Sequence, residues 1–485
     1  MTNHATAGRA ASRAEAPRAP GRLPLAGHIP QWSRDPVKLL TEAARHGDLV
    51  RLELPGRTYL VTHPEHVKHV LQDNNQNYCK GWVFNRIKEY WGDSLLTVDG
   101  DTWRQQRRRV QPSFKREHTA QFAPIITQRT SEMLARWEDV AASGGELAVY
   151  DEMNRLALVI IGDVLFGVDL WAEAPQIGAA VTSALTVLKK RVAALAPFPL
   201  WVPTRDNRQF NGAMRMLNRQ IDTIIQRKRD AGDGRRTFLS MLMEARDVET
   251  GSRMTDRQLH EEAIGMLQQG HDTVGETLAW TWYLLSLHPE VERRLHREIS
   301  EVVGDRVPVI ADLPELTYTN MVLQESLRLY PPVWVIPRDA IEDDCIGGYH
   351  IPAGSTILLS PYLTHRHSDF WENPEAFDPD RFLPERCKER PRHAYFPFGG
   401  GPRLCIAGDM ATMEVLLIMV MIAQRYRLHL VSGHREEMEC ILDMVPRHHV
   451  RSTIHRQQAV PASTPLEAAA TVTGCPWAAA RAELV

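Results

Sequence analysis

Apolar residues recur at intervals of three and four along the middle of the chain, which is the spacing of one face of an α-helix. This periodicity predicts helices over residues 119–140, 150–167, 207–230, 256–288 and 316–330. An apolar run directly after Cys405 predicts another helix. The pattern indicates a protein dominated by helices.

A smaller number of stretches alternate between apolar and other residues, as strands do. Residues 49–55 and 57–63 follow a helix-like segment at 35–47. Strand-like pieces at 333–337 and 347–360 contain the turn residues Gly-Gly and Pro-Ala-Gly. We therefore expect a mainly α fold with a minor β component.

The chain of 485 residues contains no Ser/Gly-rich linker, although its length alone would suggest about three domains of ~150 residues. We expect one helix-rich domain over residues 23–455. Residues 1–22 are rich in Arg and Ala and poor in acids, as transit peptides are, but their prolines and lack of an apolar stripe favour a disordered tail. Residues 456–485 are Ala-rich and weakly patterned, which predicts a loosely held C-terminal tail.

Composition excludes several classes of function. The 57 basic and 60 acidic side chains give a net charge of −3, so no global field indicates nucleic acid or an anionic membrane as a partner. No run of about 18 apolar residues predicts a membrane span. The six cysteines are far apart and form no CxxC pair, which disfavours a disulfide framework or zinc site and favours a reducing, cytoplasmic location.

The predicted helix over 256–288 is unusually long and has a weak point near its middle. Thr255 and Gln258 form a plausible capping box at its start. Gly270 is followed by the Asp272–Thr273 pair, and a mid-helix glycine costs about 1 kcal/mol relative to alanine. Either another group packs against this point, or the polar residues form an exposed patch.

Cys405 lies behind three glycines and at the start of the apolar helix, in the stretch FPFGGGPRLCIAG. A thiolate is a good metal ligand, and backbone N–H groups near the sulfur tune it. Arg403 can neutralise a second anion such as a carboxylate. The alternative is a structural cysteine beside a phosphate-binding glycine loop.

Two further charged patterns carry chemistry only in context. Glu325 and Arg328 are three apart on a predicted helix and share its apolar face, which suggests a partly buried pair with Arg381 as a third partner. Trp103 and Arg107 are four apart, so that an indole N–H and a guanidinium could hold a carboxylate together. Both patterns also fit an ordinary helix surface.

Together these residues closely resemble the cytochrome P-450 family of haem-thiolate monooxygenases. Phe398, Gly401, Arg403 and Cys405 match the family's F-x-x-G-x-R-x-C-x-G, with Ala407 in place of a glycine. The family's E-x-x-R, F-x-P-x-R-F, W-x-x-x-R and central Gly-x-acid-Thr patterns are met, in the family's order along the chain. The resemblance therefore implies a single domain of the cytochrome P-450 fold, of the soluble bacterial type.

The resemblance implies roles for specific residues. Cys405 would be the proximal ligand of haem b, and Trp103, Arg107, Arg338 and Arg403 would hold the haem propionates beside Phe398. Asp272 and Thr273 would deliver protons above the distal face. Glu325, Arg328 and Arg381 would form a structural network outside the active site.

Two departures from the family pattern lie on the central helix. Gln269 replaces the usual small residue, and Val274 replaces a second hydroxyl residue. Our hypothesis is that the Gln269 amide narrows the distal pocket or hydrogen-bonds a substrate oxygen.

By resemblance, the pocket walls come from four parts of the chain and are apolar and aromatic, which suits a lipophilic terpenoid, fatty-acyl or polyketide-like substrate. Apart from Gln269, these wall residues are Trp82, Phe84, Tyr90, Trp91, Leu195, Phe198, Trp201, Val333, Trp334 and Ile336. The same positions could equally be core.

The family uses O2, and no dinucleotide-binding G-x-G-x-x-G follows a predicted strand here. Electrons from NAD(P)H would therefore arrive indirectly, through a reductase and a ferredoxin or flavodoxin. A basic docking surface for such a partner is expected from Arg104, Arg108, Arg109, Lys388, Arg390 and Arg392. We expect a monomer.

Other functions remain open from the sequence. A non-catalytic haem sensor or carrier would use the same cysteine. Family members that isomerise or act on peroxides need no external electrons, but they typically lack the acid–Thr pair present here. A haem-free nucleotide-binding protein would use the glycine loop instead.

Overall fold

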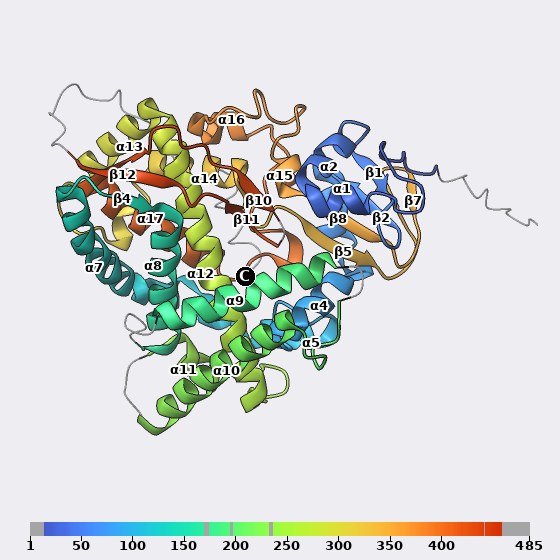
Figure 1. Ribbon diagram of the computed structural model, residues 1–485, viewed down its shortest axis with the longest axis horizontal. Helices are drawn as coiled ribbons and strands as arrows, with labels where there is room; N and C mark the ends of the chain where they lie inside the picture. The colour runs from blue at the N-terminus through green and yellow to red at the C-terminus, as the bar shows by residue number, and fades with distance from the viewer. Residues whose placement is uncertain (1–13, 169–173, 195–196, 232–235, 441, 458–485) are drawn as a thin grey trace, which may run out of the picture.

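The computed structural model describes residues 14–168, 174–194, 197–231, 236–440 and 442–457. A large helical part lies beside a smaller part built on a β-sheet, and the two form one continuous body with a roughly triangular outline (Figure 1). The long helix α12 (Asp256–Leu287) runs through the middle of the helical part. The expectation of a mainly α protein with a minor β component is confirmed.

Helices form where the apolar periodicity predicted them. The predicted segments became α7 (Ala123–Ala142), α8 (Val149–Phe166), α10 (Arg205–Ala231), α12 and α14 (Thr317–Leu329), and the helix after Cys405 became α17 (Gly408–Arg425). The remaining helices are α1 (Ile29–Arg34), α2 (Pro36–Ala44), α3 (Pro64–Lys68), α4 (Gly81–Trp91), α5 (Gly100–Val110), α6 (Arg116–Thr119), α9 (Ala174–Ala193), α11 (Phe238–Glu244), α13 (Pro289–Val302), α15 (Pro361–Thr364) and α16 (Pro384–Cys387).

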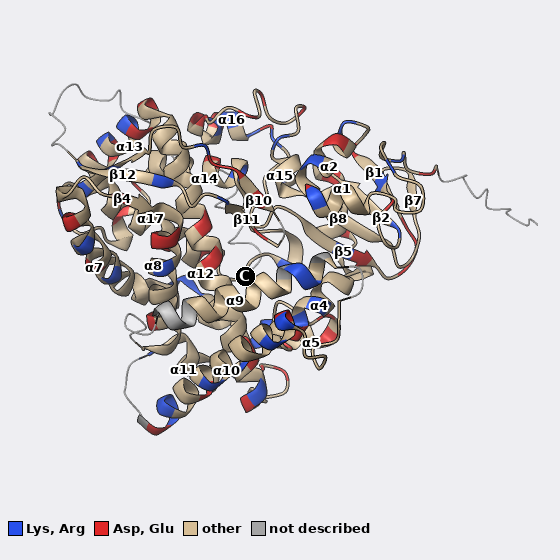
Figure 2. Cartoon of the chain, in the orientation of Figure 1, with Lys and Arg blue, Asp and Glu red and all other residues tan. Residues whose placement is uncertain are grey.

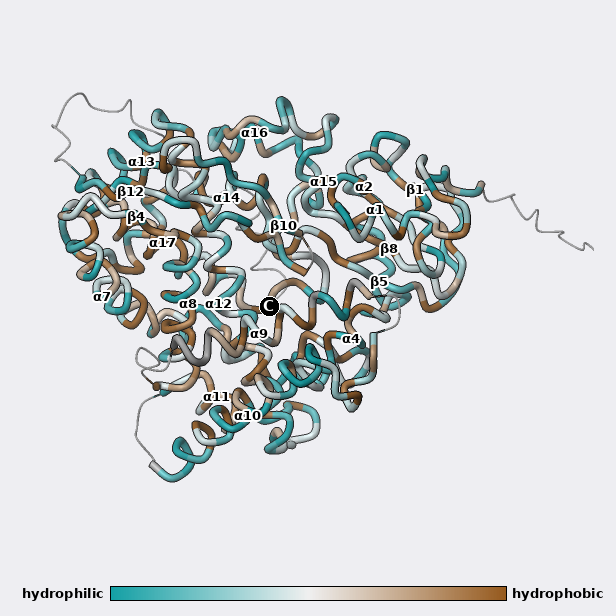
Figure 3. The backbone as a smooth tube through the Cα atoms, viewed as in Figure 1, coloured by the Kyte–Doolittle hydropathy of each residue, from teal (hydrophilic) through white to brown (hydrophobic). Residues whose placement is uncertain are grey.

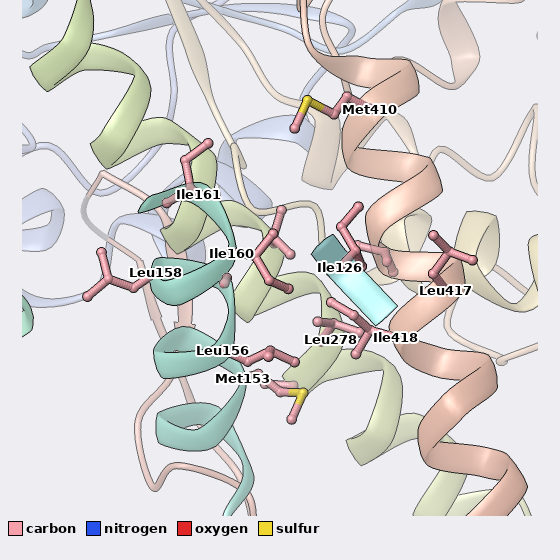
Figure 4. Packing of buried hydrophobic residues seen from close by; sticks show 14 of the residues in the cluster. Ile126, Met153, Leu156, Leu158, Ile160, Ile161, Leu278, Met410, Leu417 and Ile418 are labelled. Atoms are coloured by element: carbon pink, nitrogen blue, oxygen red, sulfur yellow. The ribbon is translucent and has the colours of Figure 1, made fainter. Parts of the chain in front are cut away.

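The principal core lies between α8, α12 and α17, together with α7. Ile160, Leu278 and Ile418 come from three of these helices and meet in one apolar layer, where their side chains are fully or almost fully buried (Figure 4). Residues 413–423 of α17 are buried all round, as expected for a helix that is apolar on every face. The apolar colouring of these helices continues into the middle of the molecule (Figure 3).

The main sheet has five strands in the order β1-β2-β8-β5-β3. These strands are β1 (Leu49–Leu52), β2 (Thr58–Val61), β3 (Tyr78–Cys79), β5 (Ile336–Ala340) and β8 (Thr356–Leu359). Only β2 and β8 pair in parallel, with Thr58 opposite Thr356. The sheet therefore joins the N-terminal part of the chain to residues almost 300 positions later.

Seven further strands lie in the described part of the chain. They are β4 (Glu146–Ala148), β6 (Asp344–Ile346), β7 (Tyr349–Ile351), β9 (Tyr426–Leu430), β10 (Met438–Cys440), β11 (Met444–Pro446) and β12 (Arg451–Arg456). The β10–β11 hairpin lies beside the middle of the molecule in Figure 1, between the helical part and the sheet.

The N-terminal boundary of the folded body lies before residue 23. Ala14 bridges to Tyr349, Arg18 bridges to Arg51, and the side chains of Ala16 and Ala19 are buried. Residues 14–22 thus lie against the sheet, which corrects the expected tail for this part. Residues 1–13 and 458–485, which hold the rest of both predicted tails, lie outside the described residues. Across the described ranges, no helix has the length and apolarity needed to cross a membrane.

The start of α12 confirms the predicted capping box. The Thr255 hydroxyl accepts from the Gln258 backbone N–H, and the Gln258 side chain accepts from the Thr255 N–H. The helix ends at Leu287, just before Pro289. At its midpoint Gly270 faces Ile161 of α8, so the group that packs against the weak point is another helix.

Candidate functional site

The cysteine loop presents Cys405 to a large cavity. The Cys405 N–H donates to the Phe398 carbonyl over 2.9 Å, which closes the loop around the intervening glycines. Gly401 has a φ of +63°, and a Cβ at this position would lie 1.8 Å from the Leu71 carbonyl oxygen. Only glycine fits there. The thiol side is exposed to the cavity, and α17 begins three residues later at Gly408.

The cavity has a volume of about 1710 Å³ and reaches from the cysteine loop to α12 on its opposite side. Its wall includes the predicted residues Trp82, Phe84, Trp91, Gln269, Val333 and Ile336. Ala407 and Phe398 also line it. The apolar wall predicted from the sequence is therefore present for this set.

The other five predicted wall residues lie elsewhere or outside the described chain. Tyr90 is buried in the principal core and does not line the cavity, which contradicts its assignment to the wall. Trp334 is 1% exposed and packs with Trp32 in a separate cluster against the sheet, which contradicts its assignment to the pocket. Its neighbours Val333 and Val335 line the cavity. Phe198 and Trp201 are exposed on the surface. Leu195 lies outside the described residues.

Positively charged side chains gather at one edge of the cavity. Arg403 forms an ion pair with Asp99 and stacks over the Trp103 ring at 5.1 Å. Arg107 donates to the Leu404 carbonyl over 3.1 Å, next to Cys405. Both Trp103 and Arg107 line the cavity, as their spacing on α5 predicted.

Arg338 and Lys80 complete this group of cations, and Lys80 was missed in the sequence. The Lys80 ammonium is buried and donates to the Leu95 carbonyl over 2.7 Å. Burial and the nearby Arg403 lower the pKa of both groups, that of Arg338 to about 10. The sequence feature that could have drawn attention to Lys80 is its position in a Lys-Gly pair directly before an amphipathic helix.

At the wall formed by α12, Tyr90 of α4 and residues of α12 form a hydrogen-bonded chain. The Tyr90 hydroxyl donates to Gln268 Oε1 over 2.9 Å, and Gln268 Nε2 donates to Asp272. The other Asp272 oxygen lies 2.7 Å from His271 Nε2. The Thr273 hydroxyl donates to the Gln269 carbonyl over 3.0 Å. Asp272 and Thr273 thus both reach the cavity wall but have separate partners.

Between residues 258 and 286 of α12, Gln269 alone is exposed. It lines the cavity. Its Nε2 donates to the Gly265 carbonyl over 3.0 Å, one turn back along the helix. Val274 is buried and lines the wall nearby.

Glu414 of α17 also lines the cavity and was not singled out in the sequence. It is fully buried among apolar residues, and burial raises the pKa of its carboxyl to about 8. The sequence feature that could have identified Glu414 is an acidic residue inside an otherwise apolar helix.

The three residues of the predicted structural network meet as expected. Glu325 receives hydrogen bonds from Arg328 Nη2 at 2.8 Å and from Arg381 Nε at 3.2 Å, and all three side chains are buried. Arg328 also donates to the His365 carbonyl, and His365 Nε2 accepts from the Phe396 N–H at 2.9 Å. The network therefore supports the start of the cysteine loop.

Most residues of the expected basic docking surface make contacts within the chain, and two of them pair with acidic residues. Arg108 pairs with Asp247 and Glu249. Arg109 is buried and bonds to Ser252. Arg390 lies over the Trp371 ring, and Arg104 pairs with Asp101. Lys388 and Arg392 remain exposed. Figure 2 shows both signs of charge interspersed over the helices of this view.

Comparison with known proteins identifies the family. The family model for cytochrome P450 matches residues 17–451. Cyclooctatin synthase of Streptomyces melanosporofaciens is 37% identical over 421 residues, covering 86% of this chain and 90% of that protein. Cyclooctat-9-en-7-ol 5-monooxygenase of the same organism is 36% identical over 418 residues, with the same coverage. Pentalenene oxygenase of Streptomyces avermitilis is 33% identical over 414 residues, covering 84% and 90%.

The chain belongs to the cytochrome P450 family, and the protein is a cytochrome P450 monooxygenase. Its cofactor is therefore a haem held by a thiolate, and O2 is its co-substrate. The residues present fit that group. Lys80, Arg338 and Arg403 gather around Asp99, and Glu262 also lies near Lys80. The three cations outnumber these two carboxylates, which leaves positive charge for the haem carboxylates to balance.

Proposed function

We propose that this protein hydroxylates a lipophilic, cyclic terpenoid with one oxygen atom of O2. The observation that carries the proposal is the exposed Cys405 thiol at the wall of a large, mostly apolar cavity that is also lined by an acid–Thr pair. The names of the three bacterial relatives support the terpenoid class over fatty-acyl and polyketide-like molecules.

Cys405 is the proposed proximal ligand of the haem iron. Its thiol faces the cavity, and the glycine loop brings backbone close to it. When bound, a haem–thiolate group supplies the activation of O2. The N-terminal end of α17 and the nearby Arg107 favour the thiolate form of the sulfur.

Trp103, Arg107, Arg338 and Arg403 are the proposed partners of the haem propionates, and we add Lys80 to this set. The support is the position of all five residues at one edge of the cavity. Charge-assisted hydrogen bonds from guanidinium and ammonium groups to carboxylates are among the strongest in proteins. Phe398 provides apolar contact in the same loop.

Asp272 and Thr273 are the proposed source of protons above the distal face. Both side chains reach the cavity wall from the middle of α12. Placed proton donors are generally worth about 10²- to 10⁴-fold in rate.

Gln269 is the proposed recognition residue for a substrate hydroxyl group. Because its Nε2 already donates to Gly265, the carbonyl oxygen Oε1 is the end available to the cavity, and this oxygen can only accept. Trp82, Phe84 and Val333 would contact the hydrocarbon skeleton around it.

The proposed electron donor is a ferredoxin or flavodoxin with its own NAD(P)H-dependent reductase. The pairing of Arg108 and Arg109 within the chain weakens the case for docking on α5. Lys388 and Arg392, which are exposed before the cysteine loop, are the better candidates.

The carbon monoxide difference spectrum of the reduced protein tests the ligand. Wild type and Cys345→Ser, a matched cysteine on β6, should show the red-shifted Soret band that thiolate ligation produces, whereas Cys405→Ala should not. If Cys405→Ala retained the band, the assignment would be overturned. A haem-free nucleotide-binding protein would give no band in any variant.

Turnover with a surrogate ferredoxin and reductase tests the reaction. A panel of cyclic terpenoids, fatty acids and macrolactones is screened for spin-state shifts and for products carrying one labelled oxygen from O2. Products from terpenoids support the proposal, and products from fatty acids or macrolactones alone contradict the substrate class. A carbon monoxide complex without any product indicates a sensor or carrier, and turnover only with peroxide indicates a peroxygenase.

A further inference from the structure

His271 and Asp272 form a buried pair whose hydrogen bonds fix their combined proton count. The imidazole is 4% exposed, and its Nδ1 lies 2.8 Å from the Leu267 carbonyl oxygen. A carbonyl oxygen only accepts, so Nδ1 carries a proton. The 2.7 Å contact between Nε2 and Asp272 Oδ1 requires a second proton. The pair therefore holds two protons, as imidazolium with carboxylate or as imidazole with carboxylic acid.

The surroundings favour the form with charge on both partners. Burial alone lowers the pKa of His271, but the charge and hydrogen bond of Asp272 outweigh it, and Leu267 and Asp443 act in the same direction, so that the pKa is raised. Asp443 comes from the segment between β10 and β11. Glu276 on α12 and Tyr150 on α8 belong to the same polar group, because Glu276, Asp272 and Asp443 all raise the pKa of Tyr150.

Asp272 is held away from the hydroxyl with which it is expected to work. Its two oxygens are taken by His271 Nε2 and by Gln268 Nε2, and Gln268 is itself held by Tyr90. The Thr273 hydroxyl donates to its own helix. Within the described ranges no hydrogen bond joins Asp272 to Thr273, so the carboxyl must leave its present partners before it can serve the cavity.

We propose that His271 is a positioning residue and proton reservoir for Asp272, which it holds as an ion pair and reloads during turnover. This inference rests on the proposed function. The proton moves from Nε2 to Oδ1, so that an N–H bond breaks, an O–H bond forms and both partners become neutral. The neutral carboxyl leaves the pair and donates its proton to the cavity side. A proton taken up from solvent and passed on by water returns to Nε2, and the imidazolium–carboxylate pair forms again.

The first test reads the pair itself. In wild type with carbon monoxide bound to the reduced haem, nitrogen-15 histidine NMR should show His271 with both ring nitrogens protonated at pH 7.5. The signal is assigned by its loss in His271→Gln. In Asp272→Asn the imidazole should lose its second proton at a lower pH than in wild type. A neutral His271 at pH 7.5 in wild type overturns the proposal, and this readout is independent of any substrate.

The second test separates proton return from positioning. His271→Gln can still donate a hydrogen bond to Asp272 but cannot supply a proton, whereas His271→Leu can do neither. The matched control is His296→Gln, because His296 is another buried histidine beside a carboxylate, Glu292, at 3.7 Å.

We expect His271→Gln and His271→Leu to bind haem and substrate but to lose at least about tenfold in product formed per NAD(P)H consumed, within the range that placed proton donors supply. Their solvent isotope effect should rise, and the pH profile of coupling should change shape. His296→Gln should behave as wild type. Wild-type coupling in His271→Gln overturns the reservoir role. If only the proposed terpenoid substrate class were wrong, wild type would form no product from terpenoids, but the NMR result for His271 would be unchanged.

Discussion

At the scale of single residues, two buried cations lie at the edge of the cavity where we propose that haem is held. Lys80 and Arg338 are buried, and burial with the neighbouring Arg403 lowers the pKa of each. Buried charges persist in proteins only when they are paired. Asp99 and Glu262 are fewer than the three cations they face, so the two carboxylates of haem would relieve the remaining repulsion. Haem binding should accordingly be coupled to these charges.

Lys80→Met provides a test at this scale. The change keeps the apolar stem and removes the ammonium, so we expect haem to dissociate about tenfold faster, since a hydrogen bond to a charged group is worth about 1.5–3 kcal/mol. The rate is measured by transfer of haem to excess apomyoglobin. Lys88→Met on α4, the helix that follows Lys80, is the control, because its ammonium is more exposed, and it should match wild type. Equal rates for all three proteins would remove Lys80 from the set.

Gln269 makes a prediction about ligands. The ligands are one steroid skeleton in three forms: the hydrocarbon, the secondary alcohol and the ketone. Wild type should bind the alcohol about threefold to tenfold more tightly than the other two, because the alcohol gains one net hydrogen bond. The ketone should gain nothing, because Oε1 cannot donate. Gln269→Glu should keep this preference and Gln269→Leu should lose it. Spin-state titration measures the affinities, and a preference for the ketone would contradict the assigned orientation of the amide.

At the scale of elements, the contact between α8 and α12 depends on two glycines. A Cβ at Gly275 would lie 1.9 Å from Asn154 Oδ1 and 2.9 Å from the Asn154 Cα. A Cβ at Gly270 would lie 2.7 Å from the end of the Ile161 side chain. A side-chain end can move, whereas a Cα moves only with its helix. The two positions therefore differ in how much a methyl group should cost.

We expect Gly275→Ala to lower the free energy of unfolding by about 1–3 kcal/mol, as overpacking does. Gly270→Ala should cost less, because the gain of about 1 kcal/mol in helix propensity offsets part of the strain. Gly212→Ala on α10 is the control, since no atom lies within 4 Å of the added Cβ, and it should stabilise the protein. Denaturant unfolding measures all three. A Gly275→Ala protein as stable as wild type would contradict the close packing.

Elements were predictable from the sequence where the signal was local. The capping box at Thr255 and the apolar face shared by Glu325 and Arg328 needed only residues three or four apart. Trp334 was placed wrongly because an apolar side chain suits a cavity wall and a packed core equally well, and here it packs in the cluster against the sheet. The strand order could not be predicted, because pairing β2 with β8 joins residues about 300 apart.

At the scale of the whole molecule, the residues that define the site depend on distant partners. The sequence alone predicts that Arg108 and Arg109 belong to a basic surface. In the folded protein they contact Asp247 and Ser252, which lie about 140 residues later in the chain. His365 likewise connects the Glu325–Arg328–Arg381 network to the cysteine loop through Phe396. The motifs named the principal site residues, but only the fold determines which charges stay exposed and which support the loop.

Glu414 connects this buried site to the stability of the whole chain. Burial raises the pKa of its carboxyl from 4.5 to about 8 in the folded protein. Between these values the unfolded chain releases the proton and the folded chain keeps it, so stability falls as pH rises, by up to about 1.4 kcal/mol per pH unit from this group.

We therefore expect the stability of wild type relative to Glu414→Gln to fall steadily from about pH 5 to pH 8 and then to level off, because Gln cannot titrate. Denaturant unfolding at each pH gives the difference between the two proteins. Met413→Leu, a neighbouring buried change without a titrating group, is the control and should run parallel to wild type at every pH. A difference between wild type and Glu414→Gln that is constant with pH would show that the Glu414 carboxyl is already ionised in the folded protein.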